Sequence, residues 1–208
     1  MEQNIPQWLI NTTDKNILQT NLSFISLFIA VYENMVDYVE TNLESLLCEE
    51  YIENGELKYK KTSEYKEEIL NRIVDSRGNK NVTKACFLWL VDNSAITQDD
   101  YEDFLVIKEV RNRYAHNLTE VIYQSVSEHE VKTFAKMRDL YRKISRWYFL
   151  NIDAVIMGYK LPDESDWNDV LSGVDIMFGI IIDILFDEKE AQYKSMLGID
   201  TASSDRKS

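Results

Sequence analysis

The sequence predicts an all-α fold, a helical bundle of about five to seven helices with a long first helix. Three observations support this prediction. Six glycines and two prolines among 208 residues leave few turns and strand breaks. Apolar residues recur at spacings of three and four along most of the chain, which is the period of an amphipathic helix. The hydrophobic content of 45%, with 12% aromatic residues, is sufficient for a core.

The first helix is expected from about Thr13 to Leu47. Its apolar residues alternate between spacings of four and three for four heptads: Leu18, Leu22, Ile25, Ile29, Tyr32, Val36, Val39, Leu43 and Leu46. Such a seam is typical of an antiparallel bundle core, which we favour, or of a dimeric coiled coil, which is the alternative.

A polar excursion is expected next, from Glu49 to Ser63. Asn54-Gly55 interrupts the helical pattern there and permits a loop or a small hairpin. Helical patterns resume at about 64–74, pause at 76–79 and continue through 83–91. The middle of the chain is therefore expected to hold shorter helices.

A helix at about 98–118 is predicted by Thr97, a hydroxyl N-cap followed by acids in the first turn. Its apolar stripe is Phe104, Ile107, Val110, Tyr114 and Leu118. Arg111 lies beside this stripe, where an arginine normally has a partner, such as Glu109 or Asp103.

A second long helix, at about 128–157, is predicted by the capping box Ser127-Glu128-His129-Glu130. Its expected core positions are Phe134, Met137, Tyr141, Ile144 and Tyr148. Between residues 132 and 146 six basic residues accompany one acid, a local balance of 6 − 1 = +5. This basic row is either a track for phosphates or a solvated face paired with acids.

Residues 1–187 are expected to form a single all-α domain, and residues 188–208 a polar C-terminal tail. The last helix of the domain is predicted to be capped by residues 163–166. Its stripe is Trp167, Leu171, Val174, Phe178, Ile181 and Leu185.

The net charge is −13, which counts against a general nucleic-acid-coating protein, and no DNA is expected as a partner. Cys48 and Cys86 lie in apolar helical patterns, which indicates buried thiols in a reducing compartment, with a disulfide as the minority alternative. The most apolar run, Ile176 to Phe186, is short and contains Asp183. We therefore expect a cytoplasmic protein without a membrane span.

The strongest functional lead is the run Arg111-Asn112-Arg113-Tyr114-Ala115-His116. An arginine can hold a phosphate and a histidine can move a proton near neutral pH, which suits attack of a ribose 2′-OH on the adjacent phosphorus. Residues five apart differ by about 140° on a helix, so Arg111 and His116 do not share a face, whereas Asn112 and His116 do. One histidine cannot easily serve as both base and acid, so a twofold dimer is expected to supply two.

The run resembles the HEPN superfamily (higher eukaryotes and prokaryotes nucleotide-binding domain), whose members share an R-x4–6-H motif on a helical bundle. The resemblance implies a metal-independent endoribonuclease without a cofactor, dimeric through the motif helices, in toxin or antiviral defence systems. It assigns catalysis to Arg111, Asn112 and His116. RNA is the implied partner, with a cognate antitoxin or inhibitor. We expect RNA to be guided by Arg113, Lys132, Lys136, Arg138, Arg142 and Arg146.

In one subset of the family a nucleotide-accepting tyrosine follows two residues after the histidine, and this sequence has Leu118 there. The alternatives are a non-catalytic interaction scaffold and a nucleotide-sensing helical domain. In those cases His116 would simply face the helix dipole. His129, within the capping box, is interpreted as structural.

Overall fold

The computed structural model describes residues 6–159 and 171–186, and the chain divides after Tyr159 into two units. The first unit contains α1 (Gln7–Thr13), α2 (Lys15–Leu47), β1 (Cys48–Glu53), β2 (Glu56–Lys61), α3 (Ser63–Tyr65), a π-helical turn (Lys66–Leu70), α4 (Val82–Asp92), α5 (Gln98–His116), α6 (Leu118–Gln124), α7 (Glu128–Tyr148), a second π-helical turn (Phe149–Asp153) and α8 (Ala154–Met157). The second unit contains α9 (Gly173–Phe186). The prediction of a mostly helical protein with a long first helix is confirmed.

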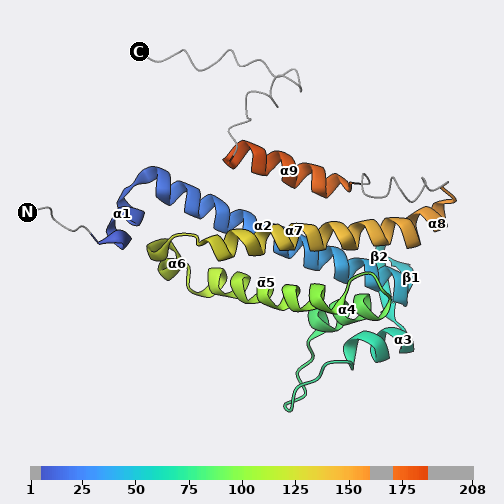
Figure 1. Cartoon of the computed structure of the whole chain (residues 1–208). Helices are drawn as coiled ribbons and strands as arrows, with labels where there is room; N and C mark the ends of the chain where they lie inside the picture. Colours follow the sequence, from blue (N-terminus) through green and yellow to red (C-terminus); the bar gives the residue numbers. More distant parts are fainter. Residues whose placement is uncertain (1–5, 160–170, 187–208) are drawn as a thin grey trace, which may run out of the picture. The chain divides into compact units, whose positions relative to one another are not determined.

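Three helices, α2, α5 and α7, lie side by side and enclose the core of the first unit (Figure 1). Phe28 of α2 contacts Tyr114 of α5 edge-on at 5.2 Å between ring centroids, and Phe134 of α7 at 5.9 Å. Phe87 of α4 stacks on Phe104 of α5 at 3.6 Å. The packing of these large rings fixes how α5 is rotated, and so decides which of its residues face solvent.

The seam predicted on α2 is correct over its central part and wrong at both ends. Val39 and Leu43 are buried as expected, but Leu22 and Leu46 are exposed. The buried set is Asn21, Phe24, Ile25, Leu27, Phe28, Val31, Tyr32, Met35, Val39, Leu43 and Leu47. A straight helix drifts by about 20° per heptad from a 3.5-residue repeat, so four heptads accumulate nearly one residue of rotation. A strict heptad pattern that matches the buried residues in the middle of α2 therefore falls on exposed residues near the ends of the helix.

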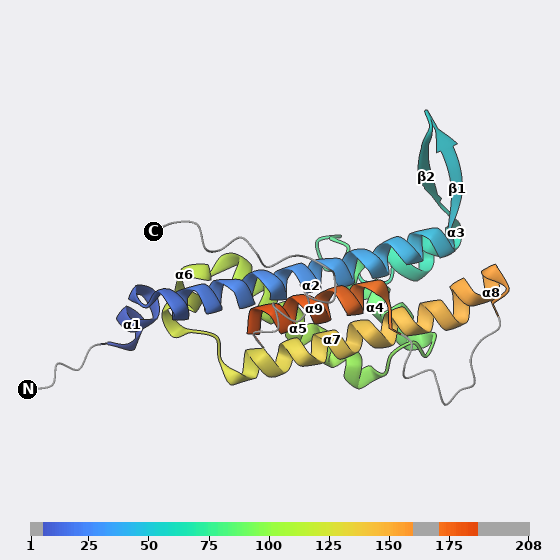
Figure 2. The same ribbon diagram turned by 90° about the horizontal axis from the view of Figure 1, so that it is seen from above.

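The polar excursion is the two-stranded antiparallel hairpin of β1 and β2, so the hairpin alternative is the correct one. Asn54 and Gly55 both have positive φ, 55° and 84°, as a tight two-residue turn requires. Figure 2 shows the hairpin extending beyond the helices at the end of α2. The helix expected over 64–74 is shorter, because the helical turns end at Leu70.

Both caps predicted for the long helices are present. Thr97 and Asp100 form a capping box on α5, and Ser127 and Glu130 form one on α7. The α5 helix ends at His116, two residues earlier than expected, and Leu118 begins α6 as an exposed residue instead of a core residue. From Glu128 to Met157 the chain is helical throughout, as predicted.

The α9 helix is capped by Ser172, whose hydroxyl oxygen accepts from the Asp175 backbone N–H at 3.1 Å. The cap expected at residues 163–166, Trp167 and the tail at 188–208 lie outside the described residues. The extent of the domain, 1–187, stays a prediction.

One described helix, α2, is long and apolar enough to cross a membrane by length and composition alone. Core helices of soluble proteins pass the same test, so this is weak evidence. Within the bundle, α2 packs its aromatic rings against α5 and α7.

Candidate functional site

The motif lies in the last two turns of α5, and its side chains point in three directions. Tyr114 is buried in the core against α2. Arg111 is half-buried on the flank that faces α2, while Arg113 and His116 are exposed. The motif is therefore divided between a flank that packs on a neighbouring helix and a face that is open to solvent.

Arg111 is bound to α2. Its Nε donates to Glu33 Oε1 at 2.7 Å, and its Nη2 also contacts that oxygen. Its Nη1 donates to Asn112 Oδ1 at 3.3 Å, and the guanidinium lies 5.5 Å from the centroid of the Tyr32 ring. The expectation of an ionic partner is confirmed, but the partner is not Glu109 or Asp103. It is supplied by another helix because the flank of α5 that carries Arg111 packs on α2.

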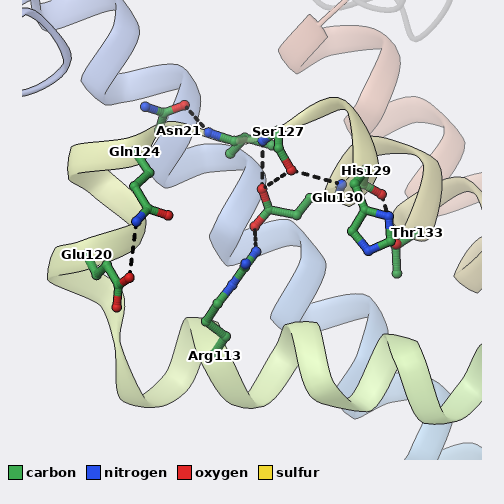
Figure 3. Close-up of polar contacts among 9 residues, drawn as sticks. Asn21, Arg113, Glu120, Gln124, Ser127, His129, Glu130 and Thr133 are labelled. Carbon is green, nitrogen blue, oxygen red and sulfur yellow. Dashed lines mark hydrogen bonds and ion pairs between the residues drawn. The ribbon is translucent and has the colours of Figure 1, made fainter. Parts of the chain in front are cut away.

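Arg113 is bound to a carboxylate of α7 that is buried, whereas the partner of Arg111 is exposed. Figure 3 shows its side chain reaching from α5 to Glu130, which also accepts hydrogen bonds from Ser127. The Ser127 amide and hydroxyl donate to Glu130 Oε2 at 2.6 and 2.7 Å. Burial alone would raise the pKa of Glu130, but the hydrogen bonds from Ser127 and the charge of Arg113 outweigh it and hold that pKa below its ordinary value.

Burial also raises the pKa of the Tyr114 hydroxyl, with the Glu130 carboxylate as a further cause. Tyr114 therefore stays neutral, and Glu130 stays ionised at neutral pH. A charged carboxylate is thus held between α5 and α7 at neutral pH.

His116 is the last residue of α5, and its imidazole is exposed. Within the described part of the chain it has no hydrogen-bond or ion-pair partner. Asn112 lies one turn earlier on the same row, and its amide oxygen already accepts from Arg111. The structure thus brings Arg111 and Asn112 together, while His116 stands apart from Arg111 on the far side of the helix.

The basic row of α7 is largely paired. Lys136 binds Asp103 at 2.6 Å and Lys143 binds Asp100 at 2.7 Å, both across the α5 and α7 contact. The other ion pairs are Lys132 with Glu128 at 2.6 Å and Arg142 with Asp139 at 3.8 Å. Arg138 and Arg146 are half-buried on the same helix. These pairs are what a solvated, acid-paired face would show, although exposed pairs can exchange their acids for phosphates.

The ion pair with Lys143 affects the acidity of Asp100. Burial would raise the pKa of Asp100, but the hydrogen bonds from Lys143 and Thr97 lower it below its ordinary value.

The two cysteines, Cys48 and Cys86, are free thiols, and burial raises the pKa of Cys86 to about 12. In residues 6–159 and 171–186, no group of three or more His, Cys, Asp or Glu side chains is arranged to hold a metal ion.

Two contacts of the motif arginines were not predicted from the sequence. Glu33 is 78 residues from Arg111, and no local pattern connects them. Glu130 was identified only as a capping residue. To predict the contact with Arg113, one would have needed to know that the capping carboxylate of Glu130 is buried against α5.

Comparisons with protein-family models, curated proteins and solved structures found no match. The resemblance to the HEPN superfamily therefore rests on the residues of the motif and on the helical context.

Proposed function

We propose that the protein is a HEPN-like, metal-independent endoribonuclease that acts as a homodimer through its motif helices. The observation that carries the proposal is the exposed imidazole of His116 at the end of α5, which has no hydrogen-bond or ion-pair partner among the described residues, with Asn112 one turn before it. An exposed side chain is within reach of a substrate, and histidine is the residue that most often transfers protons in catalysis.

In the proposed reaction the ribose 2′-OH attacks the adjacent phosphorus, and one imidazole takes the hydroxyl proton. The bond from phosphorus to the 5′ oxygen breaks, and a second, protonated imidazole gives that oxygen a proton. The products are a 2′,3′-cyclic phosphate end and a 5′-hydroxyl end. His116 from each of two copies supplies the base and the acid.

The solvent face of α5 is open to a second copy of the motif helix. Its exposed row is Glu102, Val106, Glu109, Arg113 and His116. A second copy of the same row, related by a twofold axis, would bring two histidines into one cleft. The remaining parts of the proposal, a cytoplasmic protein with a cognate antitoxin or inhibitor, derive from the resemblance.

The test is cleavage of a mixed RNA pool in EDTA by wild-type protein, His116→Ala and His129→Ala. Because proton transfer by a positioned side chain contributes about 10²- to 10⁴-fold, His116→Ala is expected to lose at least about 100-fold in rate. His129 is the other histidine of the chain and is exposed in the first turn of α7, so His129→Ala is the matched control. Cyclic phosphate ends from wild type and the control support the proposal. Full activity of His116→Ala refutes it.

A second candidate, a non-catalytic interaction module, is favoured by the pairing of Arg111 with Glu33 and Tyr32. That contact joins α2 to α5 and needs no substrate to explain the arginine. This candidate predicts dimers by mass in solution, no cleavage by any variant, and no shift in the melting temperature with RNA fragments. A nucleotide-sensing domain would instead be stabilised by a particular nucleotide in the same melting scan.

A further inference from the structure

The two arginines of the motif differ in how many donors they leave for a ligand. A guanidinium has five N–H groups. In the described residues Arg111 uses three of them, two on Glu33 and one on Asn112, whereas Arg113 uses one, on Glu130. Arg113 therefore keeps most of its hydrogen-bonding capacity.

The two arginines also differ in direction. Arg113 and His116 are three residues apart, which separates them by about 60° around the helix, against about 140° for Arg111 and His116. Both Arg113 and His116 are exposed on α5. The two side chains thus lie on neighbouring rows of the solvent face of α5, whereas the family motif pairs His116 with the arginine that points away.

Arg113 is held in position by buried groups on the core side of its guanidinium. The Glu130 side chain is only 3% exposed and is held by the amide and hydroxyl of Ser127, while the Arg113 side chain is 42% exposed. The guanidinium also lies 5.9 Å from the centroid of the buried Tyr114 ring. One edge of the guanidinium is thus anchored to a rigid, buried carboxylate, and its remaining N–H groups are left for a ligand.

We propose that Arg113, anchored by the buried Glu130 carboxylate, holds the RNA phosphate on which His116 acts, and that Glu130 is its positioning residue. This inference rests on the proposed ribonuclease function and deepens it. Arg113 stays protonated throughout and donates hydrogen bonds to the phosphoryl oxygens, while His116 carries the proton. Arg111 has a different task, which is to join α2 to the motif helix.

Four variants separate these roles. Arg113→Ala removes the proposed phosphate contact, and Arg111→Ala removes the arginine to which the family resemblance assigns catalysis. Glu130→Gln removes the charge that anchors Arg113 but keeps the capping box, since glutamine serves at this position as well as glutamate. The double variant Arg113→Ala with Glu130→Gln leaves no unpaired buried charge, so it remains informative if Arg113→Ala alone folds poorly.

The first readout is binding of a single-stranded RNA with 2′-O-methyl groups, which cannot be cleaved, measured by fluorescence anisotropy over a range of salt concentrations. Each phosphate contact contributes about 0.7 to the slope of log K against log salt for single strands. Arg113→Ala and the double variant are expected to lower the slope by about that amount per chain, and by more than Arg111→Ala lowers it. An unchanged slope for both Arg113 variants, or a loss confined to Arg111→Ala, overturns the inference.

The second readout is kcat/KM for cleavage in the same buffer. Glu130→Gln is expected to lower kcat/KM about 10-fold in the wild-type background and not at all in the Arg113→Ala background, because it acts through Arg113. Equal losses in both backgrounds would show a merely structural role and contradict the positioning assignment. Cleavage that depends on His116 but not on Arg113 overturns this inference alone. Absence of cleavage by wild type refutes the ribonuclease, whereas a lowered slope would still locate a phosphate site at Arg113.

Discussion

Two arginines of α5 each bind a glutamate from a neighbouring helix, and the two pairs are built in opposite ways. At Arg111 the arginine is the more buried partner, with side chains 29% and 49% exposed for Arg111 and Glu33. At Arg113 the acid is buried and the arginine exposed, at 3% and 42% for Glu130 and Arg113. The first pair is a link between helices, and the second presents a cation to solvent from a buried anchor.

This difference shows why a motif alone does not assign roles. Both arginines lie within reach of His116 in the sequence, yet the rotation of α5 on its aromatic core turns Arg111 toward α2 and Arg113 toward solvent. Whether an arginine can bind a ligand depends on how deeply its partner carboxylate is buried, and the spacing of residues in a motif gives no information about that burial. The two pairs therefore predict different responses to substitution.

The largest effect is expected for Glu130→Ala. It removes a helix cap, worth about 1 kcal/mol, and charge-assisted hydrogen bonds worth about 1.5–3 kcal/mol, so we expect a loss of about 2–3 kcal/mol in the free energy of unfolding. Glu33→Ala removes an exposed pair and should cost less than about 1 kcal/mol. Urea denaturation with an unchanged m-value measures both losses. Equal losses for the two variants would contradict the contrast between the pairs.

A smaller effect is expected when each arginine is removed. Arg113→Ala leaves the buried Glu130 carboxylate without its counter-ion and should cost about 1–2 kcal/mol, reduced by the solvent exposure of the arginine. Arg111→Ala should cost less than about 1 kcal/mol, from the exposed ion pair and the contact with Tyr32. Adding Glu130→Gln to Arg113→Ala should restore part of the stability. Further destabilisation by the second substitution would show that the two side chains do not form a coupled pair.

The pH dependence of stability should separate the pairs as well. The pKa of Glu130 in the folded protein lies below its ordinary value of 4.5, so its contribution is complete above that pH and is lost as the pH falls through the folded pKa. The stability gap between wild type and Glu130→Gln is therefore widest near neutral pH and narrows in acid. Denaturation curves at several pH values test this, and a gap that widens below pH 4.5 would give the wrong sign. Asp100 contributes equally to both proteins, so it cancels.

Much of the fold followed from local chemistry. The caps at Thr97 and Ser127, the unbroken helix from Glu128 to Met157 and the turn at Asn54-Gly55 each depend on neighbours in the chain, and the structure contains all of them. The α2 seam was wrong at both ends, at Leu22 and Leu46, because a heptad pattern accumulates rotational error along a straight helix.

The candidate site was less accessible to sequence reasoning. The separation of Arg111 and His116 around the helix followed from helix geometry, and both residues lie in the continuous helix α5. The partner of Arg111 did not follow, since Glu33 is brought to it only by packing of α2 against α5. The cap at Ser127 identified Glu130, but the approach of Arg113 to that carboxylate depends on the antiparallel register of α5 and α7, which the sequence does not specify.

The smallest effect concerns salt. The pair of Arg111 and Glu33 is solvent-exposed, so the difference in stability between wild type and Glu33→Ala, under about 1 kcal/mol at low salt, should nearly vanish at 1 M salt. The difference for Glu130→Ala should persist, because a buried carboxylate and its hydrogen bonds are screened much less. Thermal melts at the two salt concentrations measure both differences. Equal salt sensitivity would contradict the burial contrast.

The most direct measurement is cleavage of RNA in EDTA by wild type, His116→Ala and Arg113→Ala, with the cut ends analysed for 2′,3′-cyclic phosphate. We expect cyclic ends from wild type, at least a 100-fold slower rate from His116→Ala, in line with the contribution of about 10²- to 10⁴-fold from a positioned proton carrier, and an intermediate loss from Arg113→Ala. Cleavage at the wild-type rate by His116→Ala would contradict the proposed ribonuclease.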